Sequence, residues 1–517
     1  MDQLILRRLD DMTAEEGPEP GAALRRLTVF RGGFTAAAAA AILGLEDDPA
    51  HLDRLLTLLR GWQFVSWQTL VNGQRRERYI VDPLVVTAVG IDDSARPAHY
   101  SYFETLARRC RDSGVYTALD IEIGNLSAAF DWALGAEIAA AYQLYSAAGD
   151  FLAQHGHADQ QMDWIERLAV AVIRETDPYL RGMIQNSLGV ACQNNPLGSR
   201  RDNLRRAIAA YRAALDDHDP QTALLAHAVA QHNLGTAHAD LARIEDRAEN
   251  LWHAVEAYQI ALRYRTPEFA PLAFAATQNA LGLAYRDLAG IEDRTAHLER
   301  AIHAYQNALR HYPPQAAPLE FAATQNNLGN AYCALSAAQD FADNLRRAIN
   351  AYQSALEYRT PQAAPLAYAA TQNNLGTVYR ALATGEEPAI NLRRAIAAFE
   401  EALRYYTPEQ SPLDYAAAQN NLGAAYRALA GIEESAAFLR QAVTAFESAL
   451  RYVTPQNAPL DYATTQANLG LARQDLGERA AAVICWREAA QYFQQMGDLD
   501  KTNLMREWIT AASRVSH

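Results

Sequence analysis

The sequence predicts an all-α protein whose larger part is an array of stacked helix pairs. Three observations lead to this prediction. Half of the residues are hydrophobic, so the chain can bury apolar surface along its whole length. Apolar residues follow the spacing of one helix face around each of a series of recurring glycines. Five of the six glycine intervals are 47 residues and the first is 46, and such a period indicates units that bury their apolar faces against one another. The recurring glycines are Gly189, Gly235, Gly282, Gly329, Gly376, Gly423 and Gly470.

The first 95 residues follow a different pattern. Residues 1–20 read as a polar lead-in, and residues 21–95 as a small domain of three helices and a hairpin. We expect a helix over 22–30, a second helix capped by Thr35 and ending near Gly44, and a third over 51–60. The third helix carries leucines at 52, 55, 56 and 59, which predict one buried face. Two strand-like runs, 64–67 and 78–81, flank a turn at Asn72-Gly73.

Two segments of this N-terminal part resemble a known family. Leu24–Thr35, which reads LRRLTVFRGGFT, is similar to the start of the winged helix that follows the NTPase module in bacterial STAND (NB-ARC/AP-ATPase-like) signalling proteins. Ile121–Leu134, which reads IEIGNLSAAFDWAL, is similar to the helical segment that these proteins place before a repeat sensor. The resemblance implies a winged-helix domain at 21–95 and a linking helical segment at 96–170.

The chain departs from that family in the motifs that contact the nucleotide. Ile80-Val81-Asp82 stands where the family has Met-His-Asp, and Val81 cannot make the histidine's contact with a phosphate. Lys501 is the only lysine, so this chain contains no Walker A motif, which needs a Gly-Lys pair. We therefore expect an NTPase or effector, if one takes part, to be supplied by another chain.

Each 47-residue unit contains two helical patterns. In the first helix, Gln325, Leu328, Gly329 and Tyr332 share one face. The glycine costs about 1 kcal/mol of helix propensity, so we expect a close approach of the partner helix there. In the second helix a small-aromatic-small triplet recurs, and the aromatic is expected to fill the space that the small residues leave. The triplets are Ala348/Tyr352/Ala355, Ala395/Phe399/Ala402 and Ala442/Phe446/Ala449. Paired prolines separate the units.

These motifs resemble the tetratricopeptide repeat (TPR), which implies an α-α superhelix with a concave groove lined by the first helices. We count seven repeats within 171–493, followed by a capping helix within 494–517. The TPR unit has about 34 residues. The additional residues here lie between the two helices and between repeats, and we interpret these loops as solvated edges. Gln325 and its equivalents stand where the family usually has tryptophan.

The candidate ligand-binding residues lie on the first helices, at positions expected to face the groove. Amide side chains can hold a peptide backbone because they donate and accept at once, and arginine can grip a carboxylate bidentately. The alternative is that the asparagines bond to the neighbouring repeat, and we favour it for the second asparagine of each pair, Asn327, Asn374 and Asn421. The residues that we expect in the groove are Asn279, Asn326, Asn330, Asn373, Asn420, Arg286, Arg380 and Arg427.

The composition narrows the function classes. The net charge of −14 argues against a general affinity for nucleic acid or an anionic membrane. Arg75, Arg76 and Arg78 near the hairpin tip could touch DNA phosphates, but the leucine stripe of the third helix leaves few base-reading groups. No motif of a nucleophile, metal site or cofactor site occurs, so we predict neither catalysis nor a cofactor. The four cysteines have no close spacing and the N-terminus has no secretory signal, which indicates a cytoplasmic protein.

The sequence therefore predicts a non-enzymatic sensor or adaptor. Its groove would bind a protein or peptide ligand, and the winged and linking helices would relay occupancy to a STAND-type partner in antiviral defence or regulated proteolysis. The alternative is a transcription regulator that binds DNA through the winged helix under control of the repeats. A third hypothesis is a scaffold that only self-associates through the array.

Overall fold

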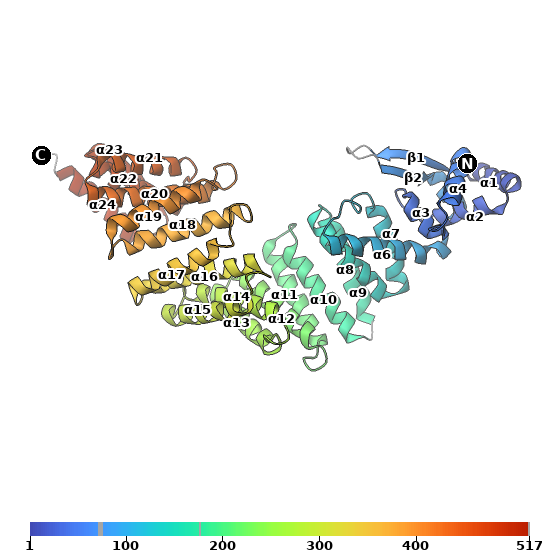
Figure 1. Cartoon of the computed structure of the whole chain (residues 1–517), viewed down its shortest axis with the longest axis horizontal. Helices are drawn as coiled ribbons and strands as arrows, with labels where there is room; N and C mark the ends of the chain where they lie inside the picture. The colour runs from blue at the N-terminus through green and yellow to red at the C-terminus, as the bar shows by residue number, and fades with distance from the viewer. Residues whose placement is uncertain (71–75, 175–176, 515–517) are drawn as a thin grey trace. The chain divides into compact units, whose positions relative to one another are not determined.

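The computed structural model describes residues 1–70, 76–174 and 177–514, which are mostly helical, as the all-α prediction requires (Figure 1). The chain divides into two compact units, Met1–Ile244 and Glu245–His517. In the described part of the chain, no helix combines the length and apolar character needed to cross a membrane.

The first unit contains the hairpin and most of the irregular connections. Its elements are α1 (Asp2–Glu16), α2 (Pro18–Leu27), α3 (Ala36–Leu43), α4 (Pro49–Gly61), β1 (Val65–Leu70), β2 (Arg76–Val81), α5 (Pro83–Val89), η1 (Asp93–Ala95), α6 (Arg96–Ser113), α7 (Ile123–Ala136), α8 (Ile138–Gln154), α9 (Ala158–Ala171), η2 (Val172–Arg174), α10 (Pro178–Asn194), α11 (Arg200–Asp217) and α12 (Leu224–Leu241).

Helix α1 occupies most of the segment that the sequence suggested only as a polar lead-in. Ile5, Leu9 and Met12 lie on one face and are buried, and Arg8 beside them donates to the Trp62 carbonyl. The next three helices form near the expected positions, although the first of them, α2, spans Pro18–Leu27 and not 22–30. The Thr35 hydroxyl accepts a hydrogen bond from the Ala38 amide at 3.2 Å and caps α3. All four leucines of the α4 stripe are buried.

The hairpin pairs β1 and β2 antiparallel, from Val65 opposite Val81 to Leu70 opposite Arg76. Phe34 extends this pairing through a bridge to Tyr79, so the loop before α3 is held against β2. The Asn72-Gly73 turn lies outside the described residues.

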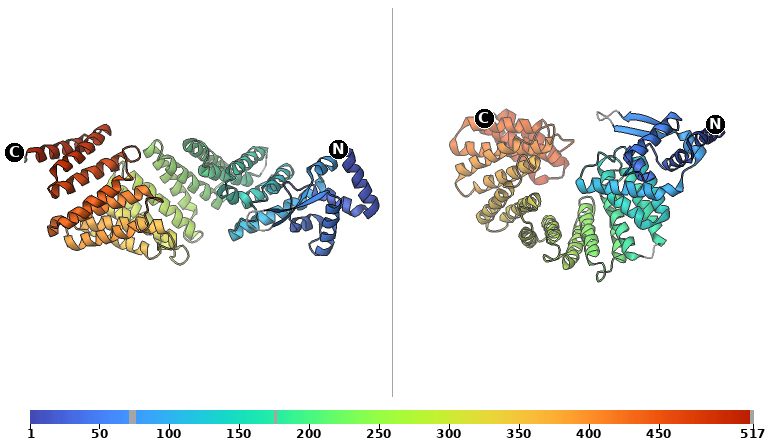
Figure 2. Two further views of the ribbon diagram at one scale, coloured as in Figure 1. Left: turned by 90° about the horizontal axis from the view of Figure 1, so that it is seen from above. Right: turned by 45° about the vertical axis from the view of Figure 1, so that its right-hand side comes forward.

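The second unit consists of successive antiparallel helix pairs followed by a last helix (Figures 1 and 2). We call the first helix of each pair an A helix and the second a B helix. The A helices are α14 (Pro271–Leu288), α16 (Pro318–Ser336), α18 (Pro365–Leu382), α20 (Pro412–Glu433) and α22 (Pro459–Asp475). The B helices are α15 (Arg294–His311), α17 (Phe341–Leu356), α19 (Pro388–Leu403), α21 (Ala436–Leu450) and α23 (Arg479–Gln495). The unit starts with α13 (Arg247–Tyr264) and ends with α24 (Leu499–Arg514).

The recurring glycine of each A helix faces the aromatic ring of its B helix, which explains its recurrence. A Cβ on Gly376 would lie 2.7 Å from the Phe399 ring, and one on Gly329 would lie 2.6 Å from the Tyr352 ring. The ring is fully buried in each case. The expected close approach of the two helices is therefore confirmed, and the space is filled by the aromatic side chain rather than by backbone.

Replacing Gly376 with alanine is expected to lower the free energy of unfolding by about 1–3 kcal/mol. The added methyl group overpacks the Phe399 ring, and this exceeds the roughly 1 kcal/mol of helix propensity that alanine gains. Gly385→Ala is the matched control, because a Cβ there has nothing within 4 Å. It should be neutral or stabilise by up to about 1 kcal/mol. Urea unfolding of the full chain measures both, and equal values for the two variants would contradict the packing explanation.

The loop between the A helix and the B helix of one repeat also contacts the neighbouring repeat. Residues at one repeat position before α15, α17, α19 and α21 have positive φ, for example Asp340 (φ 47°) and Glu387 (φ 38°). The Asn391 amide donates to the Glu386 carbonyl at 2.7 Å and closes the loop. Arg346 pairs with Glu386 of the next loop at 2.5 Å. These loops are exposed, as expected, but they also carry contacts between repeats.

Candidate functional site

The residues expected in the groove lie on the A helices of the second unit. These helices are neighbours in the order α14, α16, α18, α20 and α22 (Figure 1). We call the surface formed by Asn279, Asn326, Asn330, Asn373, Asn420, Arg286, Arg380 and Arg427 the A-helix face. All of these residues except Asn326 are half-buried.

An amide ladder runs along this face from repeat to repeat. In each step the second asparagine of one repeat donates to the first asparagine of the preceding repeat. The Nδ2–Oδ1 distances are 3.1 Å for Asn327 to Asn279, 3.3 Å for Asn374 to Asn326, 3.1 Å for Asn421 to Asn373 and 3.1 Å for Asn468 to Asn420. The interpretation of Asn327, Asn374 and Asn421 as stacking residues is therefore confirmed.

The first asparagines of the pairs differ in which side-chain hydrogen-bond donors remain without a protein acceptor. Asn279, Asn373 and Asn420 each accept one ladder bond through Oδ1. Within the described residues their Nδ2 groups donate to no protein acceptor, and their side chains are half-exposed. Each of these amides therefore keeps its donors for another molecule.

Asn326 corrects the sequence-based expectation of groove exposure, because only 8% of it is exposed. Its Oδ1 accepts from Thr371 Oγ1 at 3.2 Å as well as from Asn374, and both donors belong to the next repeat. Asn330 is likewise engaged, since its Oδ1 accepts from Tyr352 Oη at 2.7 Å and from Asn374 Nδ2 at 3.2 Å. These two asparagines bond within the array.

The three arginines of the face have different surroundings. Arg286 donates to Asp287 on its own helix, at 2.7 Å from Nη2 to Oδ1. Arg427 donates to Asp475 of the next repeat, at 2.7 Å from Nε to Oδ2. Arg380 makes no hydrogen bond or ion pair with any described residue, and its Nε is buried. Burial lowers the pKa of Arg380 below its ordinary value.

Arg78 does not contribute to the basic hairpin tip that the sequence predicts. The side chains of Arg75 and Arg76 lie outside the described residues. Arg78 is only 3% exposed and pairs with Glu122, also 3% exposed, at Nη–Oε distances of 2.6 Å and 3.1 Å. The expected contact of Arg78 with DNA is therefore wrong, because its guanidinium points into the protein.

A buried polar junction surrounds this ion pair and joins the hairpin to α7. We define it as Arg78, Glu122, Asn125 and the backbone of Gly32 and Gly33. Arg78 donates to the Gly32 and Gly33 carbonyls at 2.9 Å, and Asn125 donates to Glu122 at 2.7 Å and to the Gly33 carbonyl at 2.8 Å. Gly33 has φ 91°, and a Cβ there would lie 2.6 Å from the Tyr79 carbonyl oxygen. The absence of a side chain at Gly33 thus permits the close contact with β2 at the junction.

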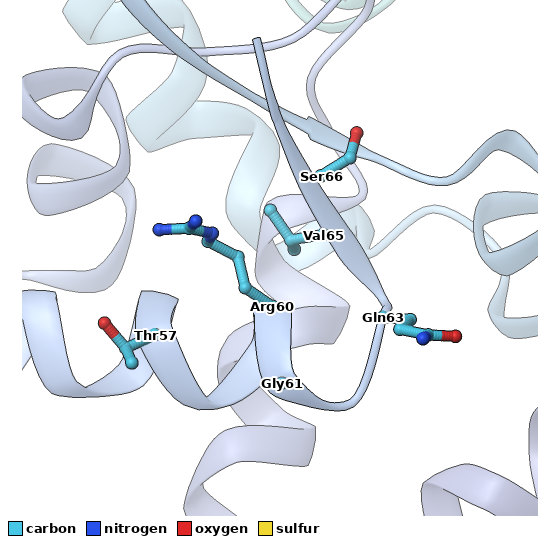
Figure 3. Close-up of a pocket in the computed structure, with 6 residues that line it drawn as sticks. All are labelled: Thr57, Arg60, Gly61, Gln63, Val65 and Ser66. Carbon is cyan, nitrogen blue, oxygen red and sulfur yellow. The ribbon is translucent and has the colours of Figure 1, made fainter.

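A shallow open pocket of about 510 Å³ lies where α4 meets β1 (Figure 3). Figure 3 shows Arg60 extending from the end of α4 beside Val65, whereas Gln63 points away on the other side. The Arg60 guanidinium lies 5.5 Å from the centre of the Trp67 ring. The buried leucines of α4 leave an opposite face on which Arg54, Thr57 and Arg60 are exposed.

Sequence reasoning missed two further rows that repeat along the second unit. Each A helix carries an aromatic residue whose ring packs edge-on against a ring near the end of its B helix. The Tyr368 and Tyr405 rings, for example, lie 5.4 Å apart between their centres. The residue after the proline that starts each A helix is an exposed leucine. The leucines are Leu272, Leu319, Leu366, Leu413 and Leu460. The recurring Pro-Leu-x-aromatic spacing was the signal that could have revealed both rows.

Comparisons with known proteins bear on the fold. A STAND protein with a tetratricopeptide repeat sensor from Pyrococcus horikoshii aligns with 96% of this chain at 12% identity and a TM-score of 0.56. The chain spans 66% of that protein's length. The C-terminal part of a TPR protein from Cytophaga hutchinsonii (13% identity, TM-score 0.39) covers 60% of this chain and 96% of its own length. The apo quorum sensor NprR from B. thuringiensis (14% identity, TM-score 0.36) covers 70% and 96% respectively.

The first of these likenesses shows that the chain is built from TPR-like helical repeats. No family profile and no curated protein matches the sequence.

Proposed function

We propose that the chain is a non-enzymatic sensor or adaptor that binds a protein or peptide ligand on its A-helix face. The free Nδ2 donors of Asn279, Asn373 and Asn420 carry this proposal. They lie on α14, α18 and α20, and their carbonyl groups are already fixed by the ladder. Preorganised donors of this kind suit the backbone carbonyls of an extended peptide, because little side-chain freedom is lost on binding. The fold shared with a protein whose TPR part is described as a sensor supports the proposal.

The N-terminal part is proposed to be a winged-helix domain, formed by α2, α3, α4 and the β1/β2 hairpin within residues 21–95. Residues 96–170 would link it to seven repeats within 171–493, which α24 would cap. The buried polar junction supports an internal packing role for the hairpin, because it holds β2 against α7. Ligand occupancy would then pass to a STAND-type NTPase or effector on another chain, in bacterial defence or regulated proteolysis.

The ligand-binding proposal is tested with a random dodecapeptide display selection on the full chain, followed by fluorescence anisotropy with the selected peptides. Asn373→Ala is expected to weaken binding about tenfold, because a lost hydrogen bond costs about 1 kcal/mol and the partner carbonyl is left unpaired. Asn421→Ala is the matched control. It removes the same bond between repeats but keeps the Asn373 side chain, and should bind nearly as well as wild type.

Two results would contradict this proposal. Equal weakening by Asn373→Ala and Asn421→Ala would mean that the ladder only stacks the repeats. A selection that enriches no binding peptide would remove the evidence for a ligand face altogether.

The alternative function, a DNA-binding regulator, is favoured only by the exposed Arg54 and Arg60 of α4. If it holds, the full chain should bind duplex DNA at low salt, and the Arg54→Ala/Arg60→Ala variant should lose that binding. Binding that is unchanged in this variant would rule out α4 as the contact.

A further inference from the structure

Three successive B helices, α15, α17 and α19, each begin at an acid that has no partner. The acids are Asp293, Asp340 and Glu387, which stand at the N-cap positions with φ of 39°, 47° and 38°. Their side chains make no capping hydrogen bond. All three residues are exposed, and none forms an ion pair with a described residue. The helix dipole favours a negative charge at this end, but the carboxylates remain open to a positively charged group from outside the chain.

The same three helices each carry an unpaired arginine two turns further on. Arg300, Arg347 and Arg394 follow the acids by seven residues, which places acid and arginine on the same side of one helix about 10 Å apart. This separation is too long for an ion pair within the helix. Each guanidinium carbon lies 5.8 Å from the centre of a tyrosine ring. The three arginines are exposed, and none forms an ion pair with a described acid, although Arg394 donates to Asn391 at 3.2 Å.

The neighbouring arginines show how the array uses charge between its own repeats. Arg346 pairs with Glu386 of the next loop at 2.5 Å, and Arg393 pairs with Glu433 at 2.8 Å. One arginine of each Arg-Arg dipeptide is thus neutralised inside the array, and the other is not. These contacts also hold the start of one B helix beside the loop that leads to the next. The unpaired acids and the unpaired arginines therefore form two rows that follow the array side by side.

Large apolar side chains are exposed at the same edge of these three repeats. Ile291, Phe341 and Ile390 lie within three residues of the acids and are 43%, 43% and 49% exposed. Apolar side chains that gather at one edge of a folded protein mark an interaction surface. We call the surface formed by the two charged rows and these three residues the loop-edge surface.

We infer that the loop-edge surface binds the same surface of a second copy of this chain. A two-fold axis that runs along the rows, midway between them, keeps the direction of the array and exchanges the two rows. Each acid of one copy then lies opposite an arginine of the other, and the shared 47-residue period matches all three repeats at once. A uniformly acidic or basic partner would satisfy only one row. Such an isologous contact closes with two copies, and it goes beyond the proposed function because it needs no ligand.

Sedimentation velocity of the full chain over a concentration series tests this association. At an ionic strength of about 50 mM the wild type is expected to form a dimer. Its dissociation constant should rise at least about tenfold at about 500 mM, because salt screens exposed ion pairs.

Two charge-reversal variants then test the pairing of the rows. Asp293→Arg/Asp340→Arg/Glu387→Arg and Arg300→Glu/Arg347→Glu/Arg394→Glu should each weaken self-association at least about 100-fold, because like charges then face each other at every step. An equimolar mixture of the two variants should form a heterodimer with close to wild-type affinity, since every pair again joins opposite charges. This heterodimer also shows that both variants are folded.

Two further variants complete the test. Asn tolerates positive φ, so the variant with Asn at the three acidic positions keeps the loops and removes only the charge. It should weaken self-association at least about tenfold, because each lost pair leaves an arginine without its carboxylate. The matched control, Arg310→Glu/Arg404→Glu/Arg451→Glu, makes the same change in net charge at exposed positions near the opposite ends of B helices. It should associate as the wild type does.

Each contrary result would overturn the inference. A wild type that stays monomeric at low salt at the highest concentration has no such interface. Weakening by the control equal to that of the arginine-row variant would mean that net charge alone governs association. A mixture of the two charge-reversal variants that forms no heterodimer would exclude the pairing of acid row with arginine row, provided that the Asn variant also associates as the wild type does. None of these results affects peptide binding on the A-helix face, which is measured separately.

Discussion

Replacing Arg78 with methionine is expected to lower the free energy of unfolding of the first unit by about 3–5 kcal/mol. Methionine keeps most of the side-chain volume but leaves the Glu122 carboxylate buried with only Asn125 as a donor. Breaking a buried ion pair on one side costs this much because the remaining charge has lost its counter-charge. Urea unfolding of the full chain gives the change, and hydrogen exchange of α7 amides assigns it to the junction.

The double variant Arg78→Met/Glu122→Gln should recover much of the loss, since no uncompensated charge then remains. Arg60→Met is the exposed control and should change stability by less than about 0.5 kcal/mol. If Arg78→Met were as mild as Arg60→Met, the hairpin arginine would not be a structural residue, and a role on the surface would have to be reconsidered.

Acidification is expected to destabilise the first unit through His99. Burial, with smaller contributions from Arg31 and Arg96, lowers the pKa of His99 from 6.5 to about 4, although Asn125 opposes the shift. The histidine is therefore neutral in the folded protein, while the unfolded chain binds a proton below pH 6.5. The contribution of His99 to stability is fully present above pH 6.5 and is lost as the pH falls to about 4. A shift of this size corresponds to roughly 3 kcal/mol.

The His99→Leu variant isolates this effect. Its free energy of unfolding should depend less on pH between 6.5 and 4 than that of wild type, with the difference between the two curves changing by roughly 3 kcal/mol over this window. Parallel curves would mean that His99 titrates normally in the folded chain and is not held neutral beside Phe30 and Phe103.

The features that could be predicted from the sequence are those with a local period. The 47-residue glycine spacing, the aromatic residue that fills the glycine's place and the buried leucines of α4 all follow from apolar spacing along one helix. The sequence also indicated bonding between repeats as the alternative to groove exposure of the asparagines, because paired asparagines recur with the same period.

Features that depend on distant partners could not be predicted. The burial of Arg78 requires Glu122, which lies 44 residues away, and the local sequence placed it with Arg75 and Arg76 as a basic tip. The burial of Asn326 depends on Thr371 of the next repeat. The lack of a bonding partner for the buried Arg380 Nε among the described residues is likewise visible only in the structure, since Arg427 in the equivalent place donates to Asp475.

The amide ladder also bears on how such an array can change its length. In each of the four ladder bonds the donor lies 48 residues after the acceptor, one repeat period plus one residue, so the same bond recurs between neighbouring A helices from α14 to α22. Unequal recombination that removes or duplicates one 47-residue block would therefore leave matching surfaces on both sides of the new junction. Evolution could lengthen or shorten the A-helix face in whole steps without redesigning its interior.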